Sequence, residues 1–243
     1  MKLGIIAALP LEVECFTDAG IEPGSHGMLS ENSCIYYSGI GPKNAARAAR
    51  SLIDSNMDAL VSWGIAGALD PALVAGDILL PMSVIDYIDS RQYPVNRHWH
   101  TILENRLKNK LAHKKNYSRQ SIISTRDVQG DPDQKIKLHR STGAIAVDME
   151  SAAIAAVASE EKKPFIIIRV ISDTTAMQLP KSAIRATDTY GRTSLSELSV
   201  GLLKNPAELF HYPVLIRSLA RARKSLEEIV RRCGTDLCIH EVL

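Results

Sequence analysis

The sequence predicts a single α/β domain in which helices cover both faces of a β-sheet, followed by a helical C-terminal extension. The first observation is length: the chain has 243 residues, a size that α/β folds often reach as one domain. The second is composition, because 45% apolar and 23% charged residues suit a packed core and exclude a disordered or collagen-like chain. The third is the alternation of short apolar runs with helical patterns, which is typical of a sheet buried on both faces.

Seven short runs rich in apolar residues are the expected strands. They are Leu3–Leu9, Cys34–Tyr37, Ala59–Trp63, Ile78–Ile85, Ser121–Ser124, Ala144–Val147 and Phe165–Ile171. Between them, Pro42 begins an expected helix that continues over residues 43–50, since proline suits the first helical turn. Ser151–Ser159 is rich in alanine, and its small side chains predict a helix that packs closely against the sheet. We therefore assign residues 1–180 to the α/β core.

Residues 181–243 have helical patterns and no clear strand, and we expect them to pack on the same domain. From Val214 to Arg232, apolar residues share one helical face, while Arg217, Arg221, Lys224 and Arg231 fall on the other. Two interpretations of this basic amphipathic helix remain open. It is either a surface helix packed on the sheet or a contact with anionic lipid headgroups at a membrane.

Charge and cysteine content restrict the function classes. A net charge of +2 does not favour nucleic acid as a partner. No uncharged run is longer than the eleven residues of Ala59–Leu69, and a transmembrane helix needs about 20. The four cysteines form no C-x-x-C pair and are too few for a disulfide framework, which favours the cytoplasm. The apolar start of the chain imitates a signal peptide, but the early carboxylates Glu12 and Glu14 argue against one.

Three segments place carboxylates or glycines at the ends of expected strands, where α/β enzymes usually bind ligands. Glu12 follows the first strand, Gly64–Gly67 form an expected small-residue turn after Trp63, and Glu150 and Asp173 follow two strands joined by a helix. We expect Glu150 and Asp173 to converge on one pocket, because paired carboxylates suit the cleavage of a glycosidic bond. The alternative is that these acids only stabilise helix starts and have no catalytic role.

The segment His98-Trp99-His100 places two imidazoles on one side of an expected strand, as a metal site would. Carboxylate or cysteine ligands are not close to it in the sequence. We therefore expect surface histidines, and no metal.

The residues named so far also carry a family resemblance. The motifs are Leu3–Ala8 with Glu12, Ser38–Gly41, Gly64–Leu69, Val74–Ile78, Val147–Glu150 and Ile171–Asp173. In this order, over roughly residues 1–175, the chain resembles the superfamily of purine nucleoside phosphorylases and methylthioadenosine/S-adenosylhomocysteine nucleosidases. The resemblance implies a mixed central sheet flanked by helices. It also implies a homo-oligomer, a dimer or higher, in which a neighbouring subunit often closes the pocket.

Within that superfamily the chain looks most like the hopanoid-associated phosphorylases, which remove adenine from adenosylhopane. Ser141–Ala144 leads directly into Val147–Ser151, and the tail runs from Tyr190 through Leu202–Pro206 to the basic helix. The lipidic substrate of that branch would give the basic helix a role as a peripheral contact with the inner membrane.

The resemblance also implies roles for individual residues. Asp173 matches the acid near purine N7, Glu12 matches the carboxylate that positions water in the nucleosidases, and Glu150 matches the carboxylate that binds ribose hydroxyls. Further substrate contacts are expected from Met149 beside the sugar, Val128 beside the base, and the backbone of Ala66 and Gly67. Carboxylates beside the sugar and a proton donor beside the base would stabilise opposite ends of one transition state.

The resemblance also implies phosphate as a co-substrate, but this chain departs from the family's phosphate loops. The family's phosphate loops commonly carry a serine where this chain has Ile65, and the arginine that often precedes the turn is replaced by Ser62 and Trp63. The remaining candidates for binding the anion are Gly41, Lys43 and Arg169. No other cofactor is expected.

Three functions remain open from the sequence. The first is phosphorolysis of adenosylhopane to adenine and ribosylhopane phosphate. The second is hydrolysis of methylthioadenosine or S-adenosylhomocysteine, with Glu12 acting on water. The third is a catalytically inactive nucleoside-binding protein, which the joint presence of Glu12, Glu150 and Asp173 argues against.

Overall fold

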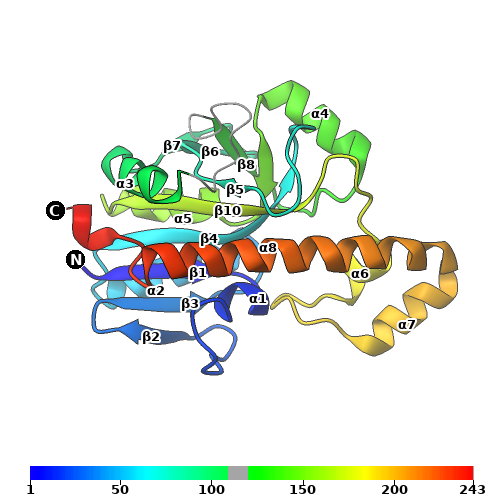
Figure 1. Ribbon diagram of the computed structural model, residues 1–243, viewed down its shortest axis with the longest axis horizontal. Coiled ribbons are helices and arrows are strands. Elements are labelled where there is room, and N and C mark those ends of the chain that lie inside the picture. The colour runs from blue at the N-terminus through cyan, green and yellow to red at the C-terminus, as the bar shows by residue number, and fades with distance from the viewer. Residues whose placement is uncertain (109–119, 243) are drawn as a thin grey trace.

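The computed structural model describes residues 1–108 and 120–242 of the chain. Within them, one sheet runs in the order β2-β3-β1-β4-β9-β8-β6-β7, with β10 paired to β4 and β5 paired to β10 (Figure 1). The strands are β1 (Leu3–Ala7), β2 (His26–Ser30), β3 (Ser33–Tyr37), β4 (Ala59–Ala68), β5 (Ile78–Leu79), β6 (Ser83–Asp86), β7 (Gln92–Pro94), β8 (Ser121–Ser124), β9 (Ala146–Asp148) and β10 (Phe165–Asp173). β3, β1, β4 and β10 are parallel, whereas β9 is antiparallel to β4. The expected mixed sheet is confirmed.

Helices flank this sheet. They are α1 (Pro10–Val13), α2 (Pro42–Asp54), α3 (Arg97–Leu107), α4 (Pro132–Thr142), α5 (Ser151–Glu160), α6 (Lys181–Ala186), α7 (Leu195–Lys204) and α8 (Tyr212–Cys233), with 3-10 helices η2 (Pro206–His211) and η3 (Ile239–Val242). α2 and α5 pack against each other, and α8 packs against β10. α8 crosses most of the length of the molecule in Figure 1. Its N-terminal end lies near α7, beyond the sheet.

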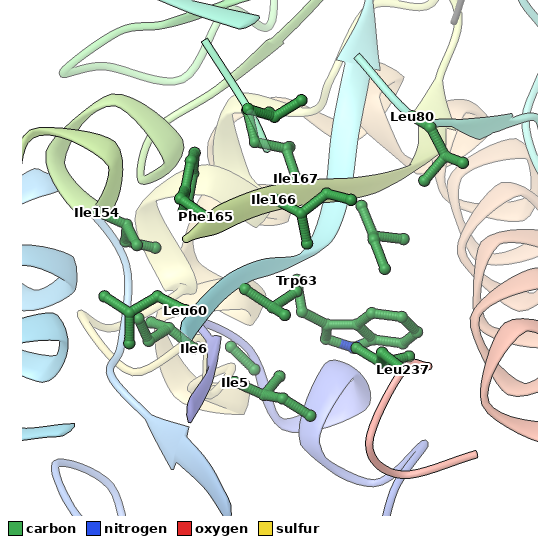
Figure 2. Close-up of a cluster of buried hydrophobic side chains, with 14 of the residues drawn as sticks. Ile5, Ile6, Leu60, Trp63, Leu80, Ile154, Phe165, Ile166, Ile167 and Leu237 are labelled. Atoms are coloured by element: carbon green, nitrogen blue, oxygen red, sulfur yellow. The ribbon is translucent and has the colours of Figure 1, made fainter. Parts of the chain in front are cut away.

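The core lies between the central strands and these helices. Every residue of β10 is buried, which explains its continuous apolar run. Figure 2 shows the side chains of Ile166 and Ile167 on opposite sides of β10, with Ile166 on the side of Trp63 and Leu237. Leu237 comes from the C-terminal end of the chain, so the tail completes the core.

Two expected strand boundaries are wrong. The run Ile78–Ile85 is two strands, β5 and β6, which pair with different neighbours. Pro81 lies between them and has no N–H to donate to a ladder. The expected turn at Gly64–Gly67 is instead a continuation of β4, because β10 pairs with β4 through Gly67.

The expectation for the two histidines is also wrong. Residues 97–107 form helix α3 rather than a strand. His98 is exposed, but His100 is only 3% exposed, and its Nε2 lies 2.8 Å from the carbonyl oxygen of Leu80. His100 is therefore part of the core, while the surface expectation holds for His98.

The chain beyond residue 180 is helical apart from short connections and an isolated bridge between Thr187 and Thr193. The C-terminal half of α8 buries Ala222, Leu226 and Ile229 completely, as the apolar face of the sequence predicts. Among the described helices, none has the length and hydropathy needed to cross a membrane.

Candidate active site

A cavity of about 450 Å³ opens where β4, β9 and β10 end. Seven of the expected site residues line it: Glu12, Ala66, Gly67, Val128, Met149, Glu150 and Asp173. The carboxyl-terminal ends of β1, β4, β8, β9 and β10 bring these segments together, although they lie far apart in the sequence.

Glu12 stands at the first turn after β1 and is 3% exposed. Its Oε2 accepts hydrogen bonds from the N–H groups of Ala8 (2.8 Å) and Leu9 (3.0 Å), and its Oε1 accepts one from Ile65 (2.8 Å). The bonds to Ala8 and Leu9 also cap the start of α1. Glu12 therefore stabilises a helix start, in addition to lining the cavity. Burial raises the pKa of Glu12, while the charge of Arg169 opposes the rise.

A glycine gives the Glu12 carboxylate its position. A Cβ at Gly64 would lie 2.2 Å from Oε1 of Glu12, far inside van der Waals contact. Gly64 therefore leaves the space into which the carboxylate reaches from α1 to the edge of β4.

Glu150 lies between β9 and α5. Its Oε1 accepts a hydrogen bond from the N–H of Gly41 (2.8 Å), and its Oε2 accepts one from Met149 (3.3 Å). Burial raises the pKa of Glu150 to about 7; the charge of Asp148 adds to the rise, and that of Arg169 opposes it. Glu150 is thus held by the backbone of its own neighbour and by that of a segment 109 residues away.

Asp173 ends β10 and has a partner that the sequence analysis did not identify. Lys135 of α4 is completely buried, and its ammonium group forms an ion pair with Oδ2 of Asp173. The same Nζ donates to the carbonyl oxygen of Thr174 at 2.9 Å. Oδ1 of Asp173 accepts a hydrogen bond from the Ser172 hydroxyl at 2.7 Å. Lys135 therefore fixes one oxygen of this carboxylate.

One indirect signal for Lys135 is visible in the sequence. Asp131 before Pro132 is a typical start of a helix, and its side chain accepts bonds from the N–H groups of Asp133 and Gln134. Lys135 and Leu138 then fall on one face of α4, three residues apart, and both are buried. The target of the lysine, 38 residues further along the chain, follows only from the fold.

Arg169 is buried beneath the site and does not line the cavity. Its Nε donates to Asp148 at 2.8 Å, and its Nη2 donates to the hydroxyls of Ser62 (2.7 Å) and Ser151 (3.0 Å). Asp148 also accepts bonds from the hydroxyls of Ser124 and Ser151. This network joins β4, β8, β9 and β10 below the carboxylates.

The three residues expected to bind phosphate do not come together. The N–H of Gly41 donates to Glu150, the guanidinium of Arg169 is directed to Asp148, Ser62 and Ser151, and Lys43 is exposed and outside the cavity lining. A phosphate at these groups would have to replace contacts that the protein already makes.

Residues of the C-terminal extension, together with the two residues just before it, form an apolar end of the cavity that the sequence analysis missed. The side chains come from the segment around α6 and from α8: Leu179, Pro180, Ala183, Ile184, Leu215 and Leu219. Leu215 and Leu219 belong to the predicted amphipathic helix, so their helical periodicity is visible in the sequence. The cavity that they line is not.

A family model described as the Phosphorylase superfamily matches residues 2–204. The chain belongs to this superfamily. It is an enzyme of the nucleoside phosphorylase and nucleosidase family, as the order of its motifs predicts.

Two relatives of this chain are named as nucleosidases. The chain is 30% identical over 195 residues to a 5′-methylthioadenosine/S-adenosylhomocysteine nucleosidase of Staphylococcus haemolyticus, covering 70% of this chain and 86% of the relative. It is 28% identical over 230 residues to a nucleosidase of the same name from Tolumonas auensis, covering 84% of this chain and 99% of the relative.

Solved structures share the fold of this phosphorylase-superfamily member. The nucleosidase of S. pneumoniae, solved with a transition-state inhibitor, has a TM-score of 0.65 at 19% identity and covers 96% of this chain and 99% of its own. Futalosine hydrolase of Helicobacter pylori has a TM-score of 0.64 at 17% identity and covers 95% and 97%. At these identities the likeness concerns the fold.

Proposed function

We propose that this superfamily member hydrolyses the N-glycosidic bond of an adenine nucleoside, of the methylthioadenosine or S-adenosylhomocysteine type. The observation that carries the proposal is the joint placement of Glu12, Glu150 and Asp173 in one cavity. The names of the relatives support water as the acceptor, and so does the absence of a free anion site among the expected phosphate residues.

Glu12 is suited to activate the water. A carboxylate offers about four acceptor positions, and three of those of Glu12 are taken by backbone N–H groups. The remaining position, on Oε1, is available to a water molecule beside the sugar. Burial raises the pKa of Glu12, which strengthens it as a base at neutral pH.

Glu150 and Asp173 act at the two ends of the bond that breaks. Glu150 accepts hydrogen bonds from ribose hydroxyls and stabilises the positive charge that develops on the sugar. Asp173, which forms an ion pair with Lys135 in the free enzyme, takes up a proton when the nucleoside binds and delivers it to N7 as the bond from N9 to the sugar breaks, so adenine leaves as a neutral base. Lys135 is a positioning residue that holds Oδ2 of Asp173, which leaves Oδ1, an acceptor of the Ser172 hydroxyl, as the oxygen that delivers the proton.

The protons balance in this scheme. Water gives one proton to Glu12 and its hydroxide oxygen to the sugar carbon, while Asp173 gives one proton to adenine. The products are adenine and the free sugar, and Glu12 then releases its proton to solvent, which balances the proton that Asp173 took up when the nucleoside bound.

Phosphorolysis of adenosylhopane is the second candidate, and one observation favours it. The apolar end of the cavity, formed by Leu179, Ile184, Leu215 and Leu219 among others, suits a large apolar group on the 5′ carbon of the nucleoside. The engagement of Gly41 and Arg169 within the protein argues against phosphate as the acceptor.

The deciding experiment measures adenine release by chromatography from methylthioadenosine, adenosine and adenosylhopane, each with and without phosphate. Hydrolysis predicts release that does not depend on phosphate and yields the free sugar. Release only with phosphate, giving a sugar phosphate, would replace hydrolysis by phosphorolysis. Asp173→Asn should abolish release while nucleoside binding persists, and unchanged release by this variant would remove Asp173 from the mechanism.

A further inference from the structure

The segment of residues 195–216, which we call the arm, exposes an unusual amount of apolar surface. It comprises α7, η2 and the start of α8 and extends beyond the sheet in Figure 1. Seven large apolar side chains of the arm are between 51% and 83% exposed: Leu195, Val200, Leu203, Leu209, Phe210, Val214 and Ile216. A concentration of this kind marks an interaction surface rather than ordinary scattered exposure.

The composition of α7 strengthens this point. The helix is ten residues long, and five of them are Leu or Val, yet none of its residues is buried. Helices in proteins are stabilised mostly by packing an apolar face against other apolar surface. α7 packs against α6 and η2, but its apolar residues need a further partner.

The charge around the arm indicates which partner. The arm itself contains Lys204, Glu197 and Glu208, and the basic charge comes from its flanks: residues 181–194 and 217–224 add seven Lys and Arg but one Asp, whereas the whole chain has a net charge of only +2. In the part of the chain that the structure describes, the charged groups of Lys204, Arg217 and Lys224 form no ion pair. Two copies of this basic surface would repel each other in a symmetric dimer, while an anionic lipid surface would attract it.

The arm is continuous with the cavity. Leu215 lines the cavity, while its neighbours Val214 and Ile216 are more than half exposed. One turn further along α8, Leu219 also lines the cavity, as do Ile184 and Leu179 from the segment around α6. Apolar surface therefore leads from the outside of the arm into the site that holds Glu12 and Asp173.

We propose that the arm docks on the surface of an anionic lipid bilayer and admits an amphiphilic nucleoside from that surface into the cavity. Phe210, Leu203 and Leu195 insert among the headgroups, and the Lys and Arg of the flanking residues 181–194 and 217–224 contact the lipid phosphates. The docking is inferred from the exposed residues of the arm and does not depend on the enzymatic activity. The admission of a nucleoside rests on the proposed function.

The test uses the full chain and vesicles made either of phosphatidylcholine or of an equal mixture of phosphatidylcholine and phosphatidylglycerol. Sedimentation should recover the protein with the mixed vesicles and much less with phosphatidylcholine alone. The double variant Leu203→Asp/Phe210→Asp should lower the partition coefficient by about tenfold or more, because it removes apolar insertion. The matched control Met28→Asp/Ile88→Asp makes the same charge change at side chains that are 60% and 56% exposed elsewhere, and it should bind like the wild type.

Two outcomes would overturn the docking proposal. One is failure of the wild-type protein to bind mixed vesicles. The other is equal loss of binding in the arm and control variants, which would make charge alone responsible. A wild-type dimer that becomes monomeric only in the arm variant, without vesicle binding, would identify a second copy as the occupant instead.

A second readout separates this inference from the proposed function. Adenine release is measured from soluble methylthioadenosine and from a 5′-dodecylthio analogue held in mixed vesicles. Because Leu203 and Phe210 do not line the cavity, the arm variant should keep the first activity and lose most of the second. No adenine release from any nucleoside, with vesicle binding intact, would refute the proposed function and leave the docking in place. Equal activity of wild type and arm variant on the vesicle-held analogue would refute admission from the bilayer.

Discussion

Replacing Lys135 by methionine tests the buried ion pair that the fold forms beneath the base end of the cavity. The substitution keeps a similar length and volume but removes the charge that faces Asp173. The side chain of Lys135 is fully buried and that of Asp173 is 8% exposed. Asp173 would then keep a carboxylate whose partner has gone, and an uncompensated buried charge is strongly unfavourable.

The magnitude follows from the burial of the pair. Removing one partner of a buried ion pair costs about 3–5 kcal/mol. Asp173 borders a cavity and keeps its bond from Ser172, so we expect the lower end, about 3 kcal/mol. For a domain of this size, that loss corresponds to a fall in melting temperature of about 6–12 °C.

Chemical denaturation of four proteins checks this value: wild type, Lys135→Met, Asp173→Asn and the double variant. Removing both charges leaves neither group uncompensated, so the double variant should recover at least half of the stability lost by Lys135→Met. The reasoning fails if Lys135→Met costs less than about 1 kcal/mol, since an exposed pair would behave in that way. It also fails if the losses of the two single variants simply add.

Three further predictions concern the rest of the site. Gly64→Ala should cut the rate of adenine release at least about tenfold, because the new Cβ would lie 2.2 Å from Oε1 of Glu12; unchanged steady-state kinetics would show that this carboxylate need not hold its position. Because the pKa of Glu150 in the folded protein is raised from 4.5 to about 7, the folded state binds the extra proton, and the free energy of unfolding should fall as pH rises from about 4.5 to 7. Denaturation at several pH values should show a flatter profile for Glu150→Gln, and an identical slope would contradict the shift. Arg169→Met should lose about 3–5 kcal/mol of stability, whereas Arg50→Met, whose pair with Glu160 is more than 60% exposed, should lose less than about 1 kcal/mol; thermal unfolding compares the two.

Local sequence was enough to predict the central strands and the carboxylates at their ends. Strands buried on both faces, such as β1, β4 and β10, need continuous apolar runs, and these are visible in a single sequence. β2 and β7 were missed because they lie at the edges of the sheet: the residues of β2 alternate between exposed and half-buried, and β7 has three residues. Edge strands need no apolar run, so their positions depend on the neighbours they pair with.

The sequence by itself determined the α/β class, the order of the family motifs and the presence of Glu12, Glu150 and Asp173, since each is a property of residues close together in the chain. Only the tertiary structure decided what those residues touch. Lys135 forms an ion pair with Asp173, 38 positions further along the chain, and Arg169 donates a hydrogen bond to Asp148. The apolar side chains of the arm remain exposed. The physical reason is that periodicity reports which face of an element is apolar, whereas strand order and helix packing decide which distant side chain occupies the space opposite that face.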